Sequence, residues 1–185
     1  MALNLEKQLV FYGSYHHDPV NVGIHMLFVP IILVTSFQMA TFLPPLFNLP
    51  DVLRFDYFPP NPGSIASLVY AFGYMLLEPV VGLLLAPLLI GSAAYANYLK
   101  DEYGMTIFYW ALGIHVVSWI AQFIGHGKFE KRAPALLDNL FQALFLAPLF
   151  VTLEYLFHVG YRPELRRRVE AQVQKNIAQF KAKQQ

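Results

Sequence analysis

The sequence contains no cysteine. This absence excludes disulfides, thiolate metal ligands and cysteine nucleophiles, so any transition metal must bind to nitrogen and oxygen atoms. Charge is also scarce: 14% of the 185 residues are charged, whereas an ordinary soluble domain carries about 25%. The 13 basic and 12 acidic side chains nearly balance, and we therefore expect no nucleic-acid partner.

Hydrophobic residues, by contrast, make up 56% of the chain. Long apolar runs separated by short polar segments are typical of membrane proteins and not of soluble enzymes. We expect an all-α fold: a multi-spanning transmembrane helical bundle with about four to five membrane segments, some of them broken or re-entrant.

Local signals define the first segments. Residues 3–15 alternate apolar and polar positions at helical spacing, which predicts a short amphipathic helix at the membrane interface. Asp18 followed by Pro19 predicts a helix start. The carboxylate can cap the first turn, and proline is tolerated there because a backbone N–H in the first turn has no partner within the helix. This helix is expected to reach about Phe42, long enough to cross a core of ~30 Å. The proline-rich residues 44–63 predict a loop outside that core.

Residues 64–99 are largely apolar, and one straight helix of that length would measure about 54 Å, too long for a single span. The run must therefore bend or reverse. Pro79 and Pro87 mark the candidate places, since each proline removes a backbone donor and clashes with the preceding turn. We expect a break at Glu78-Pro79 that gives segments 64–78 and 80–99, followed by a clearer span over 105–124.

The last third of the chain is less regular. Residues 135–158 are apolar but contain polar side chains, among them Asp138 and Glu154, so this stretch either spans the membrane or enters it and returns. Residues 161–185 predict a basic helical tail, which the positive-inside rule places in the cytosol. The expected domains are a membrane-embedded catalytic bundle over 1–160, including the interfacial helix, and the tail over 161–185.

Six histidines stand out in this apolar setting, and four lie within or at the edges of apolar runs: His16, His25, His115 and His126. Imidazoles are costly to bury in hydrocarbon without a partner, so this group predicts a metal site or a proton relay. His17 and His158 are interpreted as interfacial hydrogen-bonding residues.

Helical spacing relates some of these histidines to polar neighbours. Asn21 and His25 are four residues apart and share one helix face. His126 and Glu130 have the same spacing, which would place the imidazole beside the carboxylate if Gly127 does not break the helix.

A shared metal site constrains the topology. His25 begins its span and His126 ends the span 105–124, so these ends meet only if the two helices are antiparallel. That arrangement requires residues 64–99 to cross twice and therefore predicts a helical hairpin. His115 lies ~16 Å from His126 along a straight helix, so both can bind one ion only if the helix bends near Gly125.

Histidines with one carboxylate suit iron(II), zinc, copper or manganese. Lys128, Lys131 and Arg132 follow the last histidine of this group, and they are interpreted as cytosolic anchors or as partners of a substrate carboxylate. Glu78 is either a polar contact within the bundle or a partner that orients a histidine.

Two stretches together resemble the fungal 2-hydroxy fatty acid dioxygenase family, formerly a domain of unknown function, and the likeness covers about residues 3–165. The stretches are His16-x2-Pro19-x-Asn21-x3-His25 and Gln122-Phe123-Ile124-Gly125-His126-x3-Glu130-Lys131-Arg132-x-Pro134-Ala135-Leu136. The resemblance implies an iron(II)-dependent, multi-pass protein of the endoplasmic reticulum membrane. Such a protein shortens a 2-hydroxy fatty acid by one carbon with O2, the α-oxidation of phytosphingosine breakdown.

The resemblance also implies residue roles. His16, His25 and His126 become the leading metal ligands and catalytic residues, with His115 next and His17 as a rival to His16. The spacing of Glu130 from His126 makes this carboxylate a further catalytic candidate. The proposed contacts to the substrate are Asn21, Lys128 and Arg132. A 2-hydroxy acid can chelate iron through its carboxylate and hydroxyl, and its acyl chain favours the bilayer at ~0.8 kcal/mol per methylene.

Three other functions remain open from the residues. A diiron membrane desaturase would need several HxxxH and HxxHH boxes, and only His16-His17 hints at one. A non-enzymatic lipid-binding or scaffold protein of the reticulum would bind no stoichiometric iron. A transporter would share the broken helices and the buried Glu78, but the short chain lacks two recognisable halves.

Overall fold

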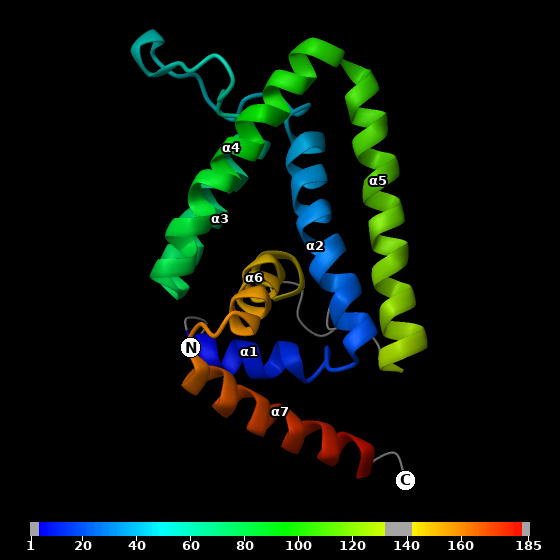
Figure 1. Ribbon diagram of the computed structural model, residues 1–185. Helices are drawn as coiled ribbons and strands as arrows, with labels where there is room; N and C mark the ends of the chain where they lie inside the picture. The colour runs from blue at the N-terminus through cyan, green and yellow to red at the C-terminus, as the bar shows by residue number, and fades with distance from the viewer. Residues whose placement is uncertain (1–3, 132–141, 183–185) are drawn as a thin grey trace. The chain divides into compact units, whose positions relative to one another are not determined.

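The computed structural model describes residues 4–131 and 142–182, and within these ranges the chain is helical with no strand. The predicted all-α fold is therefore confirmed. The elements are α1 (Leu5–Gly13), α2 (Pro19–Ala40), the 3-10 helix η1 (Asp51–Leu53), α3 (Pro62–Leu77), α4 (Pro79–Tyr103), α5 (Met105–Ile124), the π-helices η2 (Gly125–Glu130) and η4 (Gln142–Leu146), α6 (Ala147–His158) and α7 (Pro163–Ala182) (Figure 1).

Side chains cap the N-termini of α2 and α3, and the cap at Asp18 is the one that the sequence predicts. The Asp18 carboxylate accepts hydrogen bonds from the backbone N–H groups of Val20 and Asn21, at 2.9 and 3.3 Å, at the start of α2. Asn61 caps α3 in the same way, with Pro62 in the first turn. These caps satisfy donors that a helix end otherwise leaves unpaired.

Three helical segments are long and apolar enough to cross a membrane: Pro19–Ala40, Pro79–Tyr103 and Met105–Glu130. A fourth span results if the pair Ala143–His158 and Pro163–Phe180, bent by 114°, counts as one. Helix α3 is apolar but shorter, with 16 residues. Of the stretch expected over 135–158, residues 135–141 lie outside the described part, and the remainder forms η4 and α6.

The predicted hairpin over 64–99 is present. Pro79 cannot continue the hydrogen bonding of α3, and the chain turns at Glu78, whose φ and ψ are −147° and 91°. Helices α3 and α4 then pack side by side (Figure 1). The approach is so close at the turn that a Cβ on Gly82 would overlap the backbone of Met75.

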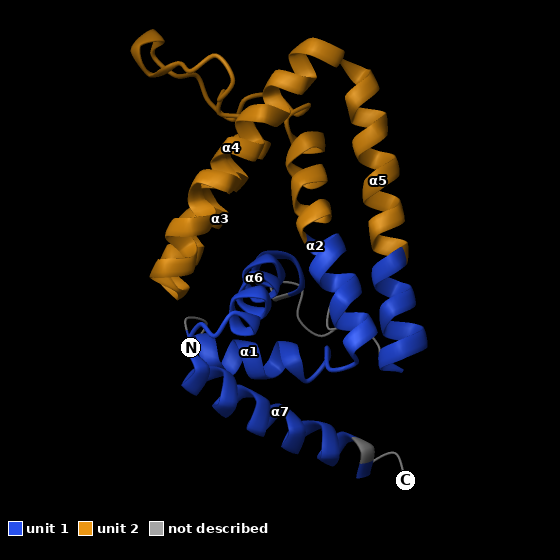
Figure 2. Cartoon of the chain, viewed as in Figure 1, with its two compact units in different colours: residues 1–29, 121–185 blue, residues 30–120 orange. Residues whose placement is uncertain are grey.

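The described chain groups into two compact units (Figure 2). The second unit, Pro30–Ile120, contains the α3–α4 hairpin together with the second half of α2 and most of α5. A buried polar network holds it: the Asn61 amide donates to Asn97 at 2.7 Å, and the Asn97 amide donates to Ser64 at 3.1 Å. Such networks are stable in an apolar interior only when every member is paired.

The first unit joins Met1–Val29 to Ala121–Gln185. Helix α7 packs against α1 (Figure 1), and its buried apolar side chains recur at every fourth position: Leu165, Val169, Val173 and Ile177. Gly13 of α1 allows this approach, because a Cβ there would overlap Val173. The domain division expected from the sequence, a membrane bundle over 1–160 and a cytosolic tail over 161–185, concerns the bilayer and stays a prediction.

Candidate metal centre

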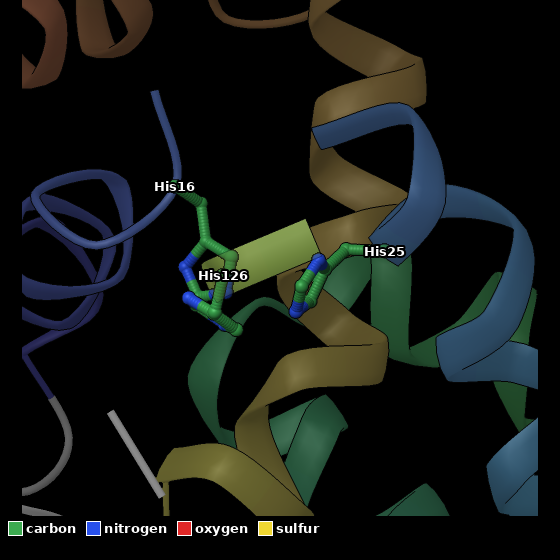
Figure 3. Close-up of side chains that lie close together, drawn as sticks. All are labelled: His16, His25 and His126. Carbon is green, nitrogen blue, oxygen red and sulfur yellow. The ribbon is translucent and has the colours of Figure 1, made fainter. Parts of the chain in front are cut away.

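Three histidines of the first unit converge on one point (Figure 3). His16 precedes α2, His25 lies in the second turn of α2, and His126 lies in η2. One nitrogen from each ring lies within 4.8 Å of the other two. The ring centroids are 4.3 to 4.9 Å apart and the rings meet edge to face. Two of the rings, those of His25 and His126, are buried.

Backbone carbonyls fix the orientation of two of these rings. Nδ1 of His16 bonds to the carbonyl oxygen of Tyr12, and Nδ1 of His25 bonds to that of Asn21, both at 2.9 Å. A carbonyl only accepts, so Nδ1 carries the proton and Nε2 carries the lone pair. Metal-binding histidines characteristically donate their second N–H to a carbonyl or carboxylate in this way.

The third ring lacks such a partner. Nδ1 of His126 is buried and makes no hydrogen bond to any described residue. Leaving a buried polar atom unpaired costs about 1–3 kcal/mol. A metal ion or a polar ligand at the convergence point would offset this cost, so the three rings fit a metal bound through nitrogen.

Glu130 anchors the segment that carries His16. Its carboxylate is fully buried and accepts from the backbone N–H groups of His17 and Asp18, at 3.2 and 3.1 Å, and from the Asn21 amide at 3.0 Å. It also forms an ion pair with the His17 ring. Glu130 thus bonds to residues 17–21 and is not one of the three residues whose ligand atoms converge. Its role as a catalytic residue stays a prediction. His17, the rival to His16, faces Glu130.

A close approach at Gly125 brings the two helices together. A Cβ at Gly125 would overlap Oδ1 of Asn21, which is fully buried and has no hydrogen-bond partner among the described residues. The π-helix that begins at Gly125 changes the register of the residues behind it, because its bonds run from i to i+5. This change turns Glu130 towards Asn21.

The fourth histidine candidate does not join the cluster. His115 belongs to the second unit, where its Nδ1 pairs with the Thr35 hydroxyl at 2.8 Å and its Nε2 accepts from Trp119 at 2.9 Å. The Thr35 hydroxyl itself donates to a backbone carbonyl. His115 is therefore a neutral ring with both nitrogens occupied, which is the expected state of a structural histidine in an apolar helix.

Of the two basic residues predicted to bind substrate, the structure describes only Lys128. Lys128 is exposed on η2, and its ammonium group lies 5.5 Å from the centre of the Phe129 ring. Arg132 lies outside the described residues.

Tyr12 escaped the sequence analysis, and Gln122 entered it only within the family resemblance, without a role. The Tyr12 ring stacks on His16, with centroids 4.1 Å apart, and also contacts Phe150. Burial raises the pKa of Tyr12, and its hydroxyl stays protonated. Gln122 is buried, and its amide nitrogen has no hydrogen-bond partner in the described chain. The sequence signal that could have singled out Gln122 is its position four residues before His126.

Comparison with known proteins gives one family and one relative. The family described as 2-hydroxy-palmitic acid dioxygenase Mpo1-like matches residues 2–159, a range that includes the whole cluster. A Saccharomyces cerevisiae protein named 2-hydroxy-palmitic acid dioxygenase MPO1 is 39% identical over 169 residues, which cover 91% of this chain and 88% of the yeast protein. No solved structure matches the chain.

Proposed function

Because this chain belongs to the 2-hydroxy-palmitic acid dioxygenase Mpo1-like family, we propose that it shortens 2-hydroxy fatty acids by one carbon with O2. The single observation that carries the proposal is the convergence of His16, His25 and His126 within a chain of this family. A lipid-binding scaffold would have no need for three oriented imidazoles around a common point.

We assign iron(II) to these three histidines. The donor set is nitrogen, since the chain has no cysteine, and three protein ligands leave positions open for substrate and O2. When bound, iron supplies the redox centre at which O2 and the 2-hydroxy acid react. The protein supplies the orientation: the carbonyls of Tyr12 and Asn21 hold two rings with Nε2 towards the common point.

Neighbouring residues control access to this point. The Tyr12 ring covers one face of His16, which restricts ring rotation and excludes water from that side. Asn21 is a proposed substrate contact, because its buried Oδ1 can accept a hydrogen bond from the 2-hydroxyl group. Lys128, exposed on η2, and Arg132 are proposed to attract the substrate carboxylate from solvent.

The proposed location is the endoplasmic reticulum membrane, with several crossings. The apolar helices α2, α4 and α5 support membrane residence. A long acyl chain partitions into a bilayer at ~0.8 kcal/mol per methylene. In a membrane enzyme, the acyl chain of the substrate can therefore stay in the lipid while its polar head reaches the histidines.

Anaerobic purification followed by iron analysis and oxygen-uptake assays with 2-hydroxyhexadecanoic acid tests this function. His25→Ala and His126→Ala should each lose stoichiometric iron and oxygen uptake. Loss of an outer partner alone weakens metal binding about 10- to 100-fold, and loss of a ligand should exceed this.

Two other histidines give the comparison. His115→Ala should retain its iron because its nitrogens bond to Thr35 and Trp119, and the exposed His158→Ala should match the wild type in every assay. Full iron content and activity in both His25→Ala and His126→Ala would show that the cluster is not the active site.

A further inference from the structure

Gln122 is a buried amide without a hydrogen-bond partner. Gln122 is 5% exposed, and its amide nitrogen Nε2 makes no hydrogen bond to any described side chain or backbone group. Gln38 is equally buried at 5%, yet its amide donates to the Ala96 carbonyl at 3.0 Å. The fold therefore pairs a comparable buried amide elsewhere, which makes the unpaired group at Gln122 a specific feature.

The position of Gln122 relates it to the histidine cluster. It lies in the last turn of α5, three residues before Gly125, so these two residues share one helix face, and His126 follows directly after Gly125. That face meets α2, because a Cβ on Gly125 would overlap Asn21 and would lie against Ile24. Gln122 is thus on the side of α5 that faces the start of α2.

The other unpaired buried atoms lie on neighbouring segments of the first unit. Within residues 4–131 and 142–182, the buried side-chain nitrogen and oxygen atoms without a partner are Oδ1 of Asn21, Nε2 of Gln122 and Nδ1 of His126. All three come from the facing segments of α2, α5 and η2. A group of unsatisfied donors and acceptors at one site indicates a polar ligand, since unpaired polar atoms are otherwise rare in protein interiors.

The chemistry of these atoms suggests what the ligand offers. An amide N–H only donates, so it needs an acceptor, and a carboxylate is an acceptor at both oxygens. We propose that the Gln122 amide donates a hydrogen bond to the carboxylate of the bound 2-hydroxy acid and so fixes the head of the substrate beside His126. This assignment rests on the proposed function. A neutral donor suits the position because burying an unpaired cation costs far more than burying an amide, and Lys128 is exposed.

Gln122→Met tests the assignment, because methionine has a similar length and cannot donate. Anaerobic binding of labelled 2-hydroxyhexadecanoic acid to iron-loaded protein in detergent should weaken about 10- to 100-fold, as expected for loss of a hydrogen bond to a charged group. KM should rise by a similar factor with a smaller change in kcat, and the iron content should stay at the wild-type value.

A second ligand separates recognition of the carboxylate from packing. The 1,2-diol of the same chain length has a hydroxymethyl group in place of the carboxylate. Its binding should change much less in Gln122→Met than binding of the acid does. Gln38→Met is the matched control: it should lower thermal stability through its lost bond to Ala96 and leave binding of the acid unchanged.

Equal weakening for acid and diol, or no weakening for either, would overturn the role of Gln122. Failure of the proposed function looks different, because the wild type itself would then lack iron or oxygen uptake with this acid, and the role of Gln122 would be lost with it. A wild type that binds iron and turns over, beside a Gln122→Met variant with normal affinity for the acid, rejects this inference alone.

Discussion

The histidine site requires a residue without a Cβ at position 125, and Gly125 provides it. Gly125→Ala should destabilise the protein by about 1–3 kcal/mol, the usual cost of overpacking, because the new Cβ overlaps Oδ1 of Asn21. The same displacement would move Asn21 away from Glu130 and reduce iron binding. Thermal unfolding in detergent and iron analysis measure both effects.

Gly127 provides the matched control for this substitution. It lies two residues further in the same π-helix, and a Cβ there would meet no atom within 4 Å. Gly127→Ala should therefore keep the wild-type stability and iron content. Equal behaviour of the two variants would mean that the contact between Gly125 and Asn21 does not hold the site together.

Residue spacing was sufficient to bring His25 and His126 together, because each lies at the end of a span that an antiparallel arrangement places at the same side, whereas the choice of His16 over His17 and His115 came from the family resemblance. Spacing was not sufficient for Glu130. An i, i+4 spacing predicts neighbours only in an α-helix, and the bonding from i to i+5 after Gly125 turns the carboxylate towards Asn21. Gln122 belonged to the motif of the family resemblance but was given no role, because a sequence does not reveal which buried amides lack a partner.

Among the elements, the α3–α4 hairpin depends on a second glycine. Gly82→Ala should destabilise the hairpin by at least about 1–3 kcal/mol, because the added Cβ would overlap backbone atoms of Met75, which cannot rotate away. Gly91→Ala in the same helix should be neutral, since a Cβ there meets nothing within 4 Å. Thermal unfolding of the two variants in detergent compares them, and equal midpoints would contradict the close contact.

The packing of α7 on α1 should depend on pH through one exposed ion pair. Arg168 donates hydrogen bonds to Glu6 and holds the pKa of Glu6 below its ordinary 4.5. A carboxylate with a lowered pKa stabilises the folded state above 4.5, and this contribution disappears as the pH falls through the folded-state pKa. The effect should be small because both groups are exposed.

Limited proteolysis of α7 measures this effect. At pH 7, Glu6→Gln should be cleaved faster than the wild type, and the difference should vanish at a pH below the folded-state pKa of Glu6. Glu170→Gln is the control, because Glu170 pairs with Arg166 inside α7. A difference between wild type and Glu6→Gln that persists unchanged in acid would exclude the ion pair as its cause.

Most element boundaries could be predicted from capping and proline signals, as at Asp18-Pro19 and Glu78-Pro79. The π-helix at Gly125 could not. Local preferences report where a helix begins and ends, whereas an i to i+5 turn depends on the tertiary contacts that make it favourable. Glu130 supplies such contacts through its bonds to the segment 17–21.

For the whole molecule, the histidine cluster joins distant parts of the chain within one unit. His16 and His25 come from Met1–Val29, and His126 comes from Ala121–Gln185. Removal of bound iron by a chelator should therefore increase hydrogen exchange in α1, the start of α2 and η2, and leave the α3–α4 hairpin unchanged. At a free iron concentration 100 times the Kd, the ligand contributes about 2.7 kcal/mol.

Hydrogen exchange with and without chelator, read by mass spectrometry, measures this prediction. The His126→Ala variant should show the exchange of the iron-free wild type under both conditions. Equal protection of α1 and η2 before and after chelation would show that the metal does not join these segments.

The separation of these ligands along the chain also has a consequence for biosynthesis. A ribosome delivers His16 and His25 early and His126 only after the hairpin has emerged. Nascent and prematurely terminated chains therefore lack a complete set of imidazoles and cannot capture iron tightly. On the proposed assignment of iron to these histidines, cofactor loading would be a late step of synthesis and would keep truncated products from carrying out uncontrolled oxygen chemistry.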